Sequence, residues 1–124
     1  MKNEDPMIFC SEQGKVKISD DIIMTIARKS VNDIEGILSI AGGFPGGVQA
    51  LFSKNTATKA GVRIEKADKS IHLNLSLEVA YGTPIPKLVE EAQKKVKEAI
   101  EAMTEIPVEN VNIFVHDIKV MEES

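Results

Sequence analysis

The sequence predicts an α+β fold of two layers, in which two long amphipathic helices cover one face of a small mixed β-sheet. Three observations support this fold class. Residues 71–81 alternate between apolar and polar side chains, residues 22–34 and 88–103 carry apolar stripes at helical spacing, and a single helix separates the last two strand patterns. The expected order of elements is β-α-(short α)-β-β-α-β.

Residues 71–81 form the strongest strand pattern, and shorter alternations at residues 14–18, 61–67 and 111–115 predict three more strands. Because only one helix joins the long strand to the last one, their connection should be right-handed and the two strands parallel. One face of the long strand is apolar, which indicates a sheet with one covered side. Its apolar residues are Ile71, Leu73, Leu75, Leu77 and Val79, and its polar residues are His72, Asn74, Ser76 and Glu78.

Each long helix has recognisable ends. Ser19 is placed to cap the first helix, with Asp20 and Asp21 near the positive end of its dipole. Gly36 stands where a helix often terminates. Thr83 is a candidate cap for the second helix, with Pro84 in the first helical position and Pro107 ending it. The apolar stripes comprise Ile22, Ile23, Ile26, Ala27, Val31 and Ile34 in the first helix, and Leu88, Val89, Ala92, Val96, Ala99, Ile100 and Met103 in the second.

The connection at residues 41–60 is rich in glycine and is the candidate interaction surface. Apolar residues at helical spacing predict a short helix over residues 47–53. Large apolar groups in such a connection either fold back as a lid on the core or form an exposed patch that marks an interface. The candidate residues are Phe44, Val48, Leu51, Phe52, Lys54 and Lys59.

The composition limits the class of protein and its location. The chain has 124 residues and a formal charge of −4, which suits one folded domain and lacks the basic footprint of a nucleic-acid binder. One cysteine, Cys10, fits a reducing compartment, and no apolar run is long enough to span a membrane, so we expect a cytoplasmic protein. The expected divisions are a flexible acidic N-terminus at 1–13, one domain at 14–118 and a tail at 119–124.

The sequence contains no catalytic, cofactor-binding or metal-binding constellation that stands out, so we expect none of these functions. His72 and His116 fall on outward strand positions, where the alternative to simple exposure is contact with a partner. Asp20 and Asp21 are adjacent and point in different directions on a helix. Residues 43–46 fit GxxG, the loop with which KH domains bind RNA, although the inner pair is Phe-Pro rather than basic.

Several segments together resemble the alkaline shock protein family of Gram-positive bacteria, over residues 14–118. The most specific piece is YG-x-x-IP, formed by Tyr81, Gly82, Ile85 and Pro86, followed by a charged helix. It leads to V-x-x-VN-(I/V)-x-V, formed by Val108, Val111, Asn112, Ile113 and Val115.

The resemblance implies a non-enzymatic protein of the envelope stress response. Family members are cytoplasmic, and some self-assemble and are held at the membrane by an anchoring protein with a related domain. Others are associated with the regulation of fatty-acid synthesis. The implied partners are therefore a second copy of the chain and a membrane-anchored relative. The alternative function is an RNA-binding module that uses the KH-like GxxG loop, or a metabolic module that regulates fatty-acid synthesis.

Overall fold

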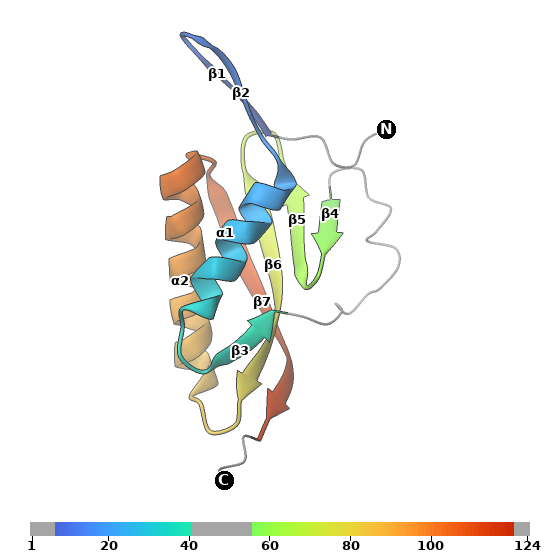
Figure 1. The fold of residues 1–124 in the computed structure, drawn as a ribbon, viewed down its shortest axis with the longest axis vertical. Helices are drawn as coiled ribbons and strands as arrows, with labels where there is room; N and C mark the ends of the chain where they lie inside the picture. The colour runs from blue at the N-terminus through green and yellow to red at the C-terminus, as the bar shows by residue number, and fades with distance from the viewer. Residues whose placement is uncertain (1–6, 41–55, 121–124) are drawn as a thin grey trace.

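The computed structural model describes residues 7–40 and 56–120, and it confirms the two-layer α+β fold (Figure 1). The side chains of residues 7–11, 56 and 57 are outside the description. The elements in chain order are β1 (Met7–Ser11), β2 (Gly14–Ile18), α1 (Asp20–Asn32), β3 (Ile37–Ile40), β4 (Thr56–Lys59), β5 (Val62–Lys66), β6 (Ile71–Ala80), α2 (Ile85–Thr104) and β7 (Val108–Lys119).

The main sheet is five-stranded and is organised around β6. β7 pairs with β6 in parallel along its whole length, from Ile71 opposite Val108 to Ala80 opposite Lys119. The parallel pairing predicted from the single-helix connection is therefore confirmed. On the other edge of β6, β5 pairs with the first half and β3 with the second half, both antiparallel. β4 pairs with β5 at the far side.

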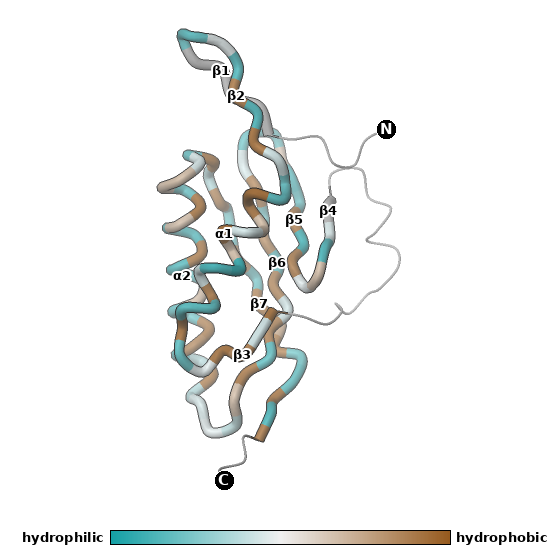
Figure 2. Tube along the Cα trace, in the orientation of Figure 1, coloured by the Kyte–Doolittle hydropathy of each residue, from teal (hydrophilic) through white to brown (hydrophobic). Residues whose placement is uncertain are grey.

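Both long helices lie on the same face of this sheet, as Figure 1 shows. The alternating apolar residues of β6 point toward them and are fully buried, which the sequence pattern predicted. Figure 2 shows the same alternation of apolar and polar residues along the helices and the central strands. The largest fully buried side chains include Ile23 and Val31 from α1, Ile64 from β5, Leu73, Leu75 and Leu77 from β6, and Val96 and Ile100 from α2.

The first predicted strand exists, but it does not belong to the main sheet. β2 pairs with β1 in a separate two-stranded sheet, and this hairpin projects beyond the helices (Figure 1). Ser11 lies opposite Gly14, so a two-residue turn joins the two strands. The backbone of β2 therefore pairs with β1 instead of with a strand of the main sheet. The structure thus has a strand at Met7–Ser11, within the segment at 1–13 that was expected to be flexible.

Other boundaries also shift. β4 lies within the stretch expected to be an irregular connection, because the tight turn at Ala60 and Gly61 lets it pair with β5. α2 begins at Ile85 with Pro84 as its N-cap residue, so Thr83 is not the cap. The short helix expected at residues 47–53 lies outside the described residues.

A buried ion pair fixes the start of α1 against the sheet. Lys66 Nζ lies 3.2 Å from Asp20 Oδ2, and their side chains are only 10% and 8% exposed. Asp20 therefore does more than complement the helix dipole, which was the role that its position in the first turn predicted. A buried pair of this kind ties two elements together because either charge alone would be poorly solvated.

Candidate interaction surface

Most of the candidate residues in the glycine-rich connection lie outside the described part of the chain. Lys59 is the exception, and it lies at the end of β4 with an exposed side chain. Its ammonium group is 3.5 Å from Asp21 Oδ1, and its carbonyl accepts a hydrogen bond of 3.1 Å from Arg28. Lys59 therefore links the β4–β5 hairpin to α1. The candidates outside the described residues are Phe44, Val48, Leu51, Phe52 and Lys54.

The sheet face opposite the helices is polar and internally hydrogen-bonded. His72 Nδ1 lies 3.0 Å from Asn110 Oδ1, and the Asn112 amide donates to Asn74 Oδ1 at 3.2 Å. These bonds join β6 to β7 through side chains as well as backbone, which fixes the positions of the polar groups. The histidines are half-buried rather than simply exposed, so the alternation predicted their face but not their contacts.

The same polar pattern continues at the other end of β6. Glu78 accepts a hydrogen bond of 3.1 Å from Ser39 Oγ on β3 and lies 3.5 Å from Lys119 Nζ on β7. Side chains therefore connect β6 to both of its neighbours at this end of the sheet, whereas the buried Nε2 of His116 has no hydrogen-bond partner in the described part of the chain. These contacts hold the polar side chains that make them in fixed positions.

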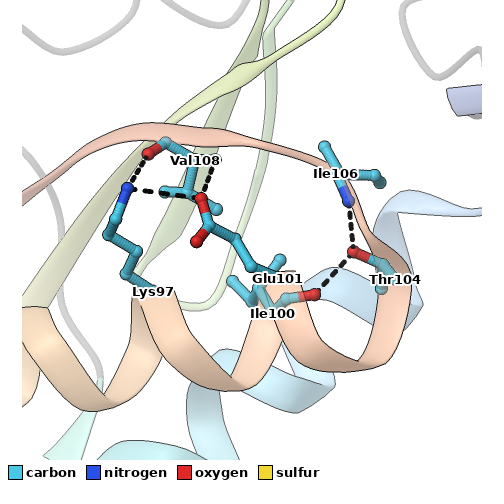
Figure 3. Close-up of polar contacts among 6 residues, drawn as sticks. All are labelled: Lys97, Ile100, Glu101, Thr104, Ile106 and Val108. Carbon is cyan, nitrogen blue, oxygen red and sulfur yellow. Dashed lines mark hydrogen bonds and ion pairs between the residues drawn. The ribbon is translucent and has the colours of Figure 1, made fainter.

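β7 is an edge strand among the described residues, and α2 protects its beginning (Figure 3). Lys97 Nζ donates to the Val108 carbonyl at 2.8 Å, and the Val108 N–H donates to Glu101 Oε2 at 2.9 Å. Further along, Gln93 Nε2 donates to the Val111 carbonyl at 2.9 Å. Side chains of the helix thus occupy backbone groups that an edge strand would otherwise present to solvent.

Glu101 is at the centre of this protection. The N–H of Val108 and then the ammonium of Lys97, 3.2 Å away, hold the pKa of its carboxyl below the usual value. Both contacts favour the ionised carboxylate. Nearby, Thr104 Oγ1 donates to the Ile100 carbonyl and accepts from the N–H of Ile106, which ends α2 and turns the chain into β7 (Figure 3).

The middle of β7 is different, because its exposed side chains include a large apolar group. Phe114 is 39% exposed on the polar face, with its ring centroid 6.5 Å from that of His116. Opposite Phe114 on β6 lies Ser76, a small residue. An aromatic ring among amides and hydroxyls is a feature of protein-binding surfaces more than of solvated ones.

Other apolar side chains are also exposed on the described surface. Tyr81 is 71% exposed just after β6, and Ile118 and Val120 are exposed near the end of β7. A groove of about 380 Å³ lies between α1 and α2, and its lining includes the apolar residues Ile26, Ala99 and Met103 and the charged residues Lys29, Asp33 and Lys95.

The sequence could have pointed to the edge of β7, but only in part. The alternation of apolar and uncharged polar residues at 111–115 could be seen in the sequence. The position of this strand at the edge of the sheet depends on the order of the strands, which the sequence does not show. The contacts from Gln93, Lys97 and Glu101 could not be found by pattern, since charged residues on a helix usually signal a solvated face.

This fold and surface define a two-layer α+β domain whose exposed features suit contacts with other macromolecules. The comparison with known families assigns this domain to one family. Residues 10–120 match the model of the alkaline shock protein 23 family, described as having a cell envelope-related function. The chain belongs to this family, which confirms the resemblance found in the sequence.

Individual relatives cover most of the chain. The uncharacterized protein YqhY of Bacillus subtilis is 29% identical over 106 residues, which are 86% of this chain and 78% of that protein. A stress response regulator gls24 homolog of Streptococcus pyogenes is 24% identical over 123 residues, 99% of this chain and 69% of that protein. The uncharacterized protein Spy1614 of Streptococcus pyogenes is 28% identical over 116 residues, 92% and 95% of the two chains.

Among solved structures, a variant of MamM CTD aligns with a TM-score of 0.47 at 10% identity, covering 82% of this chain and 95% of that chain. Within the described residues, no helix is long and apolar enough to cross a membrane. The family description and the names of the relatives together indicate a role related to the cell envelope and to stress response.

Proposed function

We propose that this protein acts without catalysis in the envelope stress response, by self-assembly and by binding protein partners. The observation that carries the proposal is the middle of the β7 edge, where an exposed Phe114 adjoins backbone without side-chain caps among the described residues. Exposed strand edges bind other chains through main-chain hydrogen bonds, and adjacent apolar side chains add affinity.

The same proposal includes a cytoplasmic location and recruitment to the membrane through a partner. A related domain carried by a membrane-anchored protein is the expected partner, because similar domains present similar strand edges. The candidate surface in the connection at residues 41–60, including Phe52, belongs to the proposal as a second contact region.

The test is sedimentation velocity and light scattering of the purified protein over a wide concentration range, with Phe114→Lys and Phe52→Asp as separate variants. We expect the mass of the unaltered protein to rise with concentration and at least one variant to weaken that rise. A monomer at every concentration, which also fails to bind the soluble domain of a membrane-anchored relative, would refute the proposal. Salt-dependent binding of single-stranded RNA by the monomer would instead favour the KH-like alternative.

A further inference from the structure

We propose that β7 pairs antiparallel with β7 of a second copy, about a two-fold axis that passes beside Phe114, so that two sheets join into one. This inference rests on the proposed function, since it assigns the surface and the geometry of self-assembly. The evidence is the direction of the backbone groups along β7, the distribution of its caps and the position of Phe114.

The hydrogen bonds along β7 show which of its backbone groups face outward. Ile71 N donates to the Pro107 carbonyl and Tyr81 N donates to the Lys119 carbonyl, so those two carbonyls point toward β6. The carbonyls of Val108 and Val111 accept instead from α2, so they point away from β6. A register shift between Val108 and Asn110 lets Val108 and Val111 face the same edge although they are three residues apart. Beyond it, successive residues point their backbone groups to opposite edges, so those of Ile113 and Val115 face the open edge as those of Val111 do.

Side chains cap both ends of this edge. Glu101 and Lys97 occupy the N–H and the carbonyl of Val108, and Gln93 occupies the carbonyl of Val111. At the other end the N–H of Ile118 donates to the side chain of Asp117 at 2.9 Å. The open stretch is therefore bounded, and it is centred on Ile113 and Val115.

The open stretch also lacks the usual features that prevent strands from pairing. Residues 111–116 read VNIFVH, with no Lys, Arg, Asp, Glu or Pro. Edge strands of monomeric proteins generally carry a charge or a proline at such a position. A short uncharged segment with high β-propensity on an edge is instead well suited to pairing with another strand.

In an antiparallel pair centred on Phe114, the outward backbone groups of this stretch bond to the same stretch of a second copy. The axis places Ile113 of each copy opposite Val115 of the other, so the outward N–H and carbonyl of both residues find partners. A two-fold axis at Ile113 would instead require the carbonyl of Val111, which Gln93 already occupies. The self-complementarity of the strand therefore selects both the occupant and the register.

The same register also brings the side chains of Phe114 from the two copies together. Phe114 lies opposite its own copy in a non-hydrogen-bonded pair, the closer of the two antiparallel arrangements, where aromatic pairs stabilise a sheet.

A charge-pair experiment tests the two-fold axis directly. Phe114→Glu and Phe114→Lys should each weaken self-association about tenfold or more, because like charges then face each other across the axis. An equimolar mixture of the two variants should recover association as a mixed dimer. Tyr81→Glu and Tyr81→Lys provide the matched control, since they alter another exposed aromatic residue by the same charges and should leave association unchanged.

Cysteine cross-linking provides a second measurement in a Cys10→Ser background. Phe114→Cys should form a disulfide between copies, since residues opposite in a non-hydrogen-bonded pair have Cα atoms about 4.5 Å apart. Asn112→Cys, on the same face of β7, should not, because its partner under this register is His116 rather than itself. Circular dichroism and thermal unfolding verify that each variant is folded.

The outcomes separate this inference from the proposed function. If the unaltered protein assembles while the Phe114 variants assemble equally well, the β7 interface is wrong and another surface mediates assembly. If each Phe114 variant loses association and the mixture does not recover it, or Asn112→Cys cross-links instead, the two-fold register is wrong. If the unaltered protein remains monomeric and binds no related domain, both the interface and the proposed function fail.

Discussion

Replacing Gly36 with alanine should destabilise the fold strongly, because the turn between α1 and β3 leaves no room for a side chain. Gly36 has a φ of +104°, and a Cβ at this position would lie 2.8 Å from Thr83 Cγ2 and 3.3 Å from Leu88 Cδ1. The Gly36 carbonyl also accepts a hydrogen bond of 2.9 Å from the N–H of Ala80. The turn therefore contacts both the end of β6 and the start of α2.

The magnitude follows from two contributions. A residue other than glycine held at positive φ costs about 1–2 kcal/mol, and forcing an extra carbon into a packed site costs about 1–3 kcal/mol. Gly36→Ala should therefore lower the free energy of unfolding by about 2–5 kcal/mol. Gly82 has a similar φ of +93°, but a Cβ there would meet nothing within 4 Å. Gly82→Ala should lower the free energy of unfolding by only about 1–2 kcal/mol.

Urea unfolding followed by circular dichroism measures both variants, and their difference isolates the steric contribution. Thr83→Ser removes the nearest carbon, so the double variant Gly36→Ala/Thr83→Ser should be more stable than Gly36→Ala alone. Equal destabilisation by Gly36→Ala and Gly82→Ala would refute the close contact with Thr83. That result would leave backbone strain as the whole effect. If self-association occurs in the assay, the comparison must be made at one protein concentration.

Three further predictions concern the same two layers. Lowering the pH from the unfolded pKa of a glutamate carboxyl through the lower folded pKa of Glu101 should destabilise the protein. A depressed folded pKa contributes stability that is fully present above the unfolded pKa and is lost as the pH falls through the folded pKa. Glu101→Gln should flatten this part of a stability–pH curve measured by urea unfolding, and an unchanged curve would contradict the role of the Val108 contact. Glu105 follows the last residue of α2 at a φ of +62°, a conformation that glycine adopts more easily than other residues. Glu105→Gly should therefore raise the free energy of unfolding by about 1 kcal/mol. A lower melting temperature of this variant would contradict the prediction. Lys66→Met leaves Asp20 buried without its ion-pair partner and should cost about 3–5 kcal/mol in urea unfolding, much of which Asp20→Leu in the same chain should recover.

The sequence predicted the parts of the fold in which one residue pattern dominates. β6 alternates without interruption and α2 has a continuous apolar stripe, so burial alone fixed their type and their inward faces. The parallel arrangement of β6 and β7 followed from handedness, because one helix connects them.

The parts that were missed depend on pairing rather than on a local pattern. β4 ends at a turn formed by Ala60 and Gly61, both at positive φ, and alanine in this position is not a recognisable hairpin signal. β1 lies in a polar segment whose partner is the adjacent β2, so its structure comes from the hairpin and not from a buried face. The tie between Asp20 and Lys66 spans two elements and has no signature in spacing.

The candidate interaction surface shows the same difference between what a local pattern predicts and what strand pairing determines. Apolar residues in a glycine-rich connection stand out because they break a pattern, whereas Phe114 continues one and looks ordinary within an alternating strand. Its importance arises from topology: the parallel crossover from β6 places β7 at the edge of the described sheet. α2, which makes that crossover, then caps Val108 and Val111 but does not cap Ile113 or Val115 through any side chain in the described region. α2 therefore both places β7 at the edge of the sheet and determines how much of that edge stays uncapped. A substitution in α2 such as Gln93→Leu should extend the uncapped stretch toward the N-terminal end of β7.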